Sequence, residues 1–127
     1  MHAASFIRRR EIILEYELLD KPSLPLILVH EIFHFVWARL SNATRASFSA
    51  LLAEEFRGKA RGELGESASV RKQLDPHGRD YVCESFCDTA AWLYAAPGKD
   101  GNATLAKRWQ TRRRLWFEAA FAGPIHC

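Results

Sequence analysis

Hydrophobic residues follow a helical period over most of this chain. The segment Leu24 to Leu40 is apolar nearly all round, which is typical of a helix that runs through the middle of a domain. Three later segments repeat apolar residues at spacings of three and four, and each predicts a further helix: Ala46 to Arg61, Tyr81 to Ala96, and Ala103 to Phe121. The pattern therefore predicts a mostly helical domain with one buried central helix.

Two segments depart from the helical pattern. Arg10 to Leu19 is rich in β-forming residues and alternates partially, with Glu15 and Glu17 on either side of Tyr16, so it predicts a strand. Gly58 to Gly78 carries glycines, serines and charges, and it predicts a long loop. A loop of this length in a small domain is often functional.

Length and composition narrow the class of protein. With 127 residues the chain fits one domain over residues 1–127, and 48% hydrophobic with 26% charged residues is ordinary for a folded domain. The cysteines are odd in number and lack a CxxC pair, which argues against a disulfide framework: Cys83, Cys87 and Cys127. A reducing, cytoplasmic location is expected.

Charge and hydropathy argue against two kinds of partner. The net charge of +3 is mild, and the basic runs Arg8 to Arg10 and Arg112 to Arg114 lack an aromatic platform beside them. We expect both runs to be solvated surface and do not expect nucleic-acid binding. The longest apolar run, Leu24 to Leu40, is short for a membrane span and contains ionisable residues, so no membrane partner is expected.

The central predicted helix carries the main chemical signal, His30-Glu31-Ile32-Phe33-His34. Two histidines four residues apart lie about 400° around a helix, so both imidazoles leave the same face and can bind one metal ion. Glutamate after the first histidine completes the HExxH motif of zinc metallopeptidases. In that motif the histidines bind Zn²⁺ and the glutamate accepts a proton from the attacking water.

A catalytic zinc site needs a third protein ligand and an open position. The metzincin pattern would place glycine at Trp37 and histidine at Leu40, so that type is excluded. Acidic, histidine and cysteine side chains elsewhere are the alternatives: Glu54, Glu55, His77, Glu84, Asp88, His126 and Cys127. Glu84 and Asp88 lie four residues apart on one helical face, which suits a ligand followed by a carboxylate that orients a ligand histidine.

These two motifs resemble those of the gluzincins, the thermolysin-like peptidases, whose second motif is N-E-x-x-S-D. The resemblance implies that Glu84 is the third zinc ligand and that Asp88 accepts the other ring proton of His30. Cys83 and Cys87 stand where the family has asparagine and serine, and we expect them to be small buried residues without a role. The implied fold is α+β and zincin-like, with a small mixed or antiparallel sheet packed on the active-site helix.

The expected function is therefore zinc-dependent hydrolysis of peptide or protein substrates, with Glu31 as general base. The oxyanion needs a further donor, for which Tyr81, His77, Tyr94 and an arginine are candidates; Tyr81 is preferred because it lies one turn before Glu84. Two alternatives are a zinc-binding regulatory domain without turnover and a basic helical nucleic-acid-binding protein.

Overall fold

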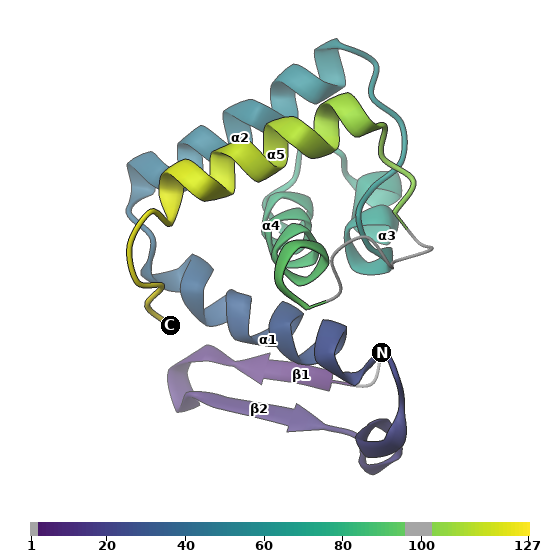
Figure 1. The fold of residues 1–127 in the computed structure, drawn as a ribbon, viewed down its shortest axis with the longest axis vertical. Coiled ribbons are helices and arrows are strands. Elements are labelled where there is room, and N and C mark those ends of the chain that lie inside the picture. The colour runs from purple at the N-terminus through teal and green to yellow at the C-terminus, as the bar shows by residue number, and fades with distance from the viewer. Residues whose placement is uncertain (1–2, 96–102) are drawn as a thin grey trace.

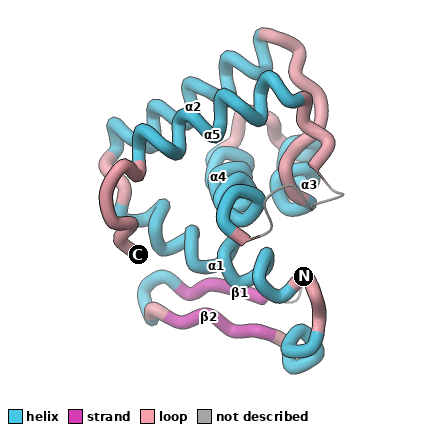
Figure 2. Tube along the Cα trace, in the orientation of Figure 1, coloured by secondary structure: helices cyan, strands magenta, loops and turns pink. Residues whose placement is uncertain are grey.

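The computed structural model describes residues 3–95 and 103–127, which form a mostly helical α+β domain. The sheet of this described part is a two-stranded antiparallel hairpin that precedes the helices (Figures 1 and 2). The predicted α+β class and helical majority are confirmed. The elements in chain order are β1 (Ala3–Phe6), the 3-10 helix η1 (Ile7–Arg9), β2 (Glu11–Leu14), the 3-10 helix η2 (Tyr16–Asp20), α1 (Leu24–Arg39), α2 (Asn42–Arg57), α3 (Glu66–Leu74), α4 (Arg79–Tyr94) and α5 (Lys107–Ala120).

The hairpin differs from the single strand predicted over Arg10 to Leu19. Only the first part of that segment is a strand, β2, and its second part forms η2. The partner strand β1 was not predicted, because four residues are too few for an alternating pattern to be recognised. In the hairpin Ala3 pairs with Leu14 and Phe6 with Glu11, and Arg10 closes the turn in the left-handed region with φ 54°.

Helix α1 matches its predicted range to within one residue. Ser23 is its N-cap residue, Pro25 lies in its first turn, and Leu40 is its C-cap residue. The helix lies between the hairpin on one side and α4 on the other (Figure 1). No helix in the described part of the chain is long and apolar enough to span a bilayer.

An aromatic cluster fixes α1, α2, α4 and α5 against one another. Phe86 of α4 is fully buried at its centre, with its ring centroid 5.9 Å from Phe33, 5.6 Å from Phe48 and 5.2 Å from Phe117. Ring pairs at such separations stabilise a fold by about 0.5–1.5 kcal/mol each beyond their burial. The two helices that carry the chemical motifs, α1 and α4, are therefore held on a common core.

The predicted loop from Gly58 to Gly78 contains a helix, so that prediction was wrong. Helix α3 (Glu66–Leu74) occupies its middle and packs against α4. Its sequence is polar, and Ala68 is its one fully buried residue. A nine-residue helix with so little apolar surface is stable only through tertiary contacts, which explains why the sequence pattern did not reveal it.

The other helix boundaries shift by a few residues. Helix α2 begins earlier than predicted because Ser41 caps it, accepting a hydrogen bond from Thr44 N–H at 3.1 Å. Helix α4 begins at Arg79, two residues before its predicted start, with Gly78 as its N-cap residue and Asp80 in its first turn. The predicted end of this helix at Ala96 lies outside the described residues.

Candidate metal centre

The two histidines of α1 point toward α4. His30 and His34 leave α1 one turn apart with their ring centroids 5.1 Å apart, as their spacing predicts. His30 is buried and His34 is partly buried. The pair therefore lies at the contact between the two helices rather than on open surface.

Glu84 of α4 lies against both imidazoles. One carboxylate oxygen is 2.9 Å from Nε2 of His30, and the other is 3.4 Å from Nε2 of His34. Burial opposes ionisation of this carboxyl, but the hydrogen bonds from the two histidines lower its pKa to about 2. Without a metal ion, Glu84 is thus an ionised carboxylate between two Nε2 atoms.

The same contacts raise the pKa values of the histidines. Burial lowers the pKa of His30, but hydrogen bonds to Asp88 and Glu84 outweigh it and raise that pKa to about 9. Burial likewise lowers the pKa of His34, and its contacts with Cys83 and Glu84 raise it to about 10. In the metal-free protein both imidazoles are therefore positively charged at neutral pH.

Asp88 occupies the other side of His30. Its Oδ1 atom is 2.7 Å from Nδ1 of His30, and its Oδ2 atom accepts a hydrogen bond from the Ala68 N–H at 2.8 Å. When the imidazole is neutral, a carboxylate on Nδ1 favours the form that carries its proton there, so Nε2 is the nitrogen that would be available to a metal ion. Asp88 and Glu84 thus contact the two different ring nitrogens of His30.

Glu31 lies beside the histidines at the contact with the hairpin. It is 2% exposed, and one carboxylate oxygen is 4.0 Å from Nε2 of His30. Its other oxygen accepts a hydrogen bond from the hydroxyl of Ser5 in β1, and that hydroxyl also lies 2.9 Å from the Glu31 carbonyl oxygen. Ser5 was not found from the sequence, because the strand that carries it was not predicted.

The two cysteines of α4 are closer to the histidines than expected. Donor atoms of His30, His34 and Cys87 all lie within 4.8 Å of one another, so these three residues form a cluster that could hold a metal ion. Cys83 lies with its sulfur 3.5 Å from Nδ1 of His34. A hydrogen bond with Cys87 and the contact with His34 lower the pKa of Cys83 to about 6 against the effect of burial. The sequence did not reveal that the Cys83 and Cys87 sulfurs lie this close to the histidine nitrogens.

Tyr81, the expected oxyanion donor, has a different hydrogen-bond partner. Its hydroxyl donates to the carboxylate of Glu63, and the side chain is 5% exposed. Burial and the neighbouring Glu63 charge raise its pKa. The hydroxyl thus belongs to a buried polar network and is not directed at the histidines.

The remaining candidates for the third ligand form other contacts or are exposed. Glu54 pairs with Arg112 at the surface, and Glu55 pairs with Arg113 in the interior. The imidazole of His77 packs on the ring of Phe56. His126 and Cys127 are exposed at the C-terminal end.

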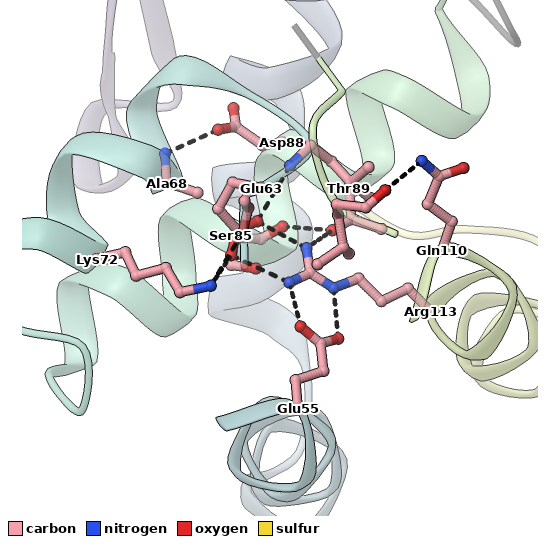
Figure 3. A network of polar contacts seen from close by, with 12 residues as sticks. Glu55, Glu63, Ala68, Lys72, Ser85, Asp88, Thr89, Gln110 and Arg113 are labelled. Atoms are coloured by element: carbon pink, nitrogen blue, oxygen red, sulfur yellow. Dashed lines mark hydrogen bonds and ion pairs between the residues drawn. The ribbon is translucent and has the colours of Figure 1, made fainter. Parts of the chain in front are cut away.

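Arg113 is fully buried, contrary to the expectation that the run Arg112 to Arg114 is solvated surface. Its guanidinium donates to both carboxylate oxygens of Glu55 at 2.8 and 2.7 Å and to those of Glu63 at 2.8 and 3.0 Å (Figure 3). A further bond of 3.1 Å reaches the hydroxyl of Thr89 on α4. The network therefore joins α2, α4, α5 and the segment before α3.

Comparison with known proteins does not assign the chain to a family. No protein-family model, curated protein or solved structure was found to match the chain.

Proposed function

We propose that the chain is a zinc-dependent metallopeptidase that hydrolyses peptide bonds. The observation that carries the proposal is the convergence of three groups: Nε2 of His30, Nε2 of His34 and the Glu84 carboxylate. The Glu31 carboxylate lies 4.0 Å from the first of these nitrogens. Two imidazoles and one carboxylate are the ligand set of a gluzincin-type zinc site, and a carboxylate beside it suits a general base.

The donor atoms fit Zn²⁺. Asp88 engages Nδ1 of His30, so that histidine offers Nε2 to an ion, and this is the nitrogen that Glu84 faces. The Glu84 carboxylate contacts both Nε2 atoms, so these three groups together would hold the cation. For this reason we favour Glu84 over Cys87 as the third ligand.

Zn²⁺ bound by these residues supplies a Lewis acid that polarises a peptide carbonyl and lowers the pKa of a water molecule. Glu31 then accepts a proton from the attacking water and passes it to the leaving amine. The hydrogen bond from Ser5 holds the Glu31 carboxylate in place for this transfer. Asp88 holds the His30 ring in the orientation that presents Nε2.

Two glutamine substitutions test the proposal. Glu84→Gln should remove zinc binding, whereas Glu31→Gln should retain one zinc per chain and lower the cleavage of a quenched peptide by roughly 10²–10⁴-fold. The exposed Glu17 provides the control, since Glu17→Gln should change neither zinc content nor cleavage. Cleavage that survives Glu31→Gln, or zinc binding that survives Glu84→Gln, contradicts the assignment.

The Cys87 thiol favours a second candidate, a zinc-binding domain without turnover. Its sulfur lies within 4.8 Å of histidine donor atoms, and a thiolate added to two histidines and Glu84 would give a closed site with four protein ligands. Closed sites of this kind are structural. Zinc bound by the wild-type chain without cleavage of casein or any quenched peptide supports this candidate.

A further inference from the structure

The carboxylate of Asp88 is held from a second side by the first turn of α3. Its Oδ2 atom accepts a hydrogen bond from the N–H of Ala68, while Oδ1 faces His30 (Figure 3 shows the Ala68 contact). Amide groups in the first turn of a helix have no partner within that helix. Asp88 therefore caps α3 from another helix, and each of its oxygens has a separate partner.

Gly65 allows this close approach. A Cβ atom at this position would lie 2.4 Å from both Cγ and Oδ2 of Asp88, which is closer than real Cβ contacts. The backbone of Gly65 is extended, with φ −170° and ψ 168°, so an alanine could adopt the same conformation. Space for the Asp88 carboxylate, rather than backbone freedom, is the reason that glycine suits this position.

The segment before Gly65 is held by hydrogen bonds from Arg113 and from the backbone that precedes α5. Arg113 donates two hydrogen bonds to the Glu63 carboxylate, and the Glu63 carbonyl accepts from the N–H groups of Thr104 at 2.9 Å and Leu105 at 3.2 Å. The turn that contacts Asp88 is thus attached to the buried network and does not depend on α3 alone.

We infer that the turn from Gly65 to Ala68 is a positioning element for His30. By holding Oδ2 of Asp88, it directs Oδ1 to Nδ1 of His30 and so turns the other ring nitrogen toward the proposed ion site. The part of this inference that concerns the ion rests on the proposed function. The part that concerns the His30–Asp88 hydrogen bond does not.

Gly65→Ala tests the inference by placing one methyl group against the Asp88 carboxylate. Zinc affinity should fall by roughly 10–100-fold, the loss typical when the partner of a ligand histidine is disturbed. Gly123→Ala is the matched control, because nothing lies within 4 Å of the added Cβ, and it should bind zinc as the wild type does. Unchanged zinc affinity in folded Gly65→Ala overturns the inference.

The Asp88→Ala background separates positioning from a general structural effect. Once Asp88 is absent, Gly65→Ala should cause no further loss of zinc affinity, whereas a merely structural role would lower affinity by the same factor in both backgrounds. If Gly65→Ala alone does not fold, the double variant should recover folding, because the clashing carboxylate is gone. Failure of the double variant to fold while Asp88→Ala folds would contradict the inference.

A metal-free measurement distinguishes failure of this inference from failure of the proposed function. In the wild type, NMR should detect a slowly exchanging, downfield Nδ1 proton on His30, and Gly65→Ala should weaken or shift that signal while Gly123→Ala leaves it in place. If the wild type binds no zinc, the proposed function fails, but the same signal still decides the inference. A Nδ1 signal that is identical in wild type and Gly65→Ala overturns it.

Discussion

Replacing the buried Arg113 by methionine should destabilise the domain severely. The side chains of Arg113, Glu55 and Glu63 are 0%, 3% and 2% exposed, so the substitution leaves two carboxylates in the interior without their cation. Removing one partner of a buried ion pair costs about 3–5 kcal/mol. A domain of this size has a free energy of unfolding of about 5–15 kcal/mol, so much of its stability would be lost.

Urea unfolding monitored by tryptophan fluorescence measures this loss. With a slope of about 2 kcal/mol per molar urea, the midpoint should fall by roughly 2 M. Arg112→Met is the control in the adjacent position, because its ion pair with Glu54 joins side chains that are 50% and 44% exposed. Such surface pairs contribute about 0–1 kcal/mol, so the control should shift the midpoint little.

The loss caused by Arg113→Met should also depend on pH. Burial raises the pKa of Glu63, but the charge and hydrogen bonds of Arg113 lower it by a larger amount. The pKa of Glu63 therefore lies below its usual value. In the wild type this carboxylate therefore adds stability that is present above its unfolded pKa and is lost as pH falls through the lower folded value. In the variant, burial without the cation raises the pKa of Glu63, so the difference in stability from wild type should be smaller at pH 5 than at pH 7.5. A loss below about 1 kcal/mol at pH 7.5 would refute the role assigned to the network.

Three further predictions follow from single contacts. Zinc binding at pH 7 should release roughly two protons per ion, because the pKa values of His30 and His34 are about 9 and about 10 before the ion binds. Calorimetry in buffers of different ionisation enthalpy measures the number of protons released, and a release below one proton contradicts the prediction. Ser85→Ala should leave the urea midpoint unchanged or raise it, because the buried hydroxyl has no hydrogen-bond partner in the described structure and an unsatisfied group costs about 1–3 kcal/mol; a lower midpoint contradicts it. Ser41→Ala should cost about 1 kcal/mol in the same assay through loss of the bond from Thr44, and an unchanged midpoint would show that the cap is not stabilising.

The face of α1 that carries the two histidines could be predicted from the sequence, because helical spacing alone places His30 and His34 together. The partner on α4 could not be identified in this way: the four-residue spacing of Glu84 and Asp88 suited a ligand and its orienting carboxylate, and the resemblance then implied Glu84, but spacing alone did not bring either residue to α1. Contacts between residues about 50 positions apart depend on how the helices pack. The position of Ser5 against Glu31 was missed because the short strand that carries Ser5 was not predicted.

The sequence signal for the buried ion pair of Arg113 was weak rather than absent. Arg113 stands four residues from both Trp109 and Phe117, so it interrupts an apolar stripe at its centre, and all three side chains are buried. Charge in such a position indicates a buried ion pair when acids occupy a matching stripe, as Glu55 does after Leu51. Helix α3 had no such pattern, because its cap comes from Asp88 on another helix.

The most direct test of the proposed site is the coordination shell of zinc in the loaded protein, measured by X-ray absorption. The proposed site should give one zinc per chain with nitrogen and oxygen neighbours only, at about 2.0–2.2 Å, from His30, His34 and Glu84. A sulfur neighbour at about 2.3 Å would place Cys87 or Cys83 in the shell and contradict the assignment of an open site with Glu84 as the third ligand. Failure of the folded wild-type chain to bind zinc would contradict the metal centre itself.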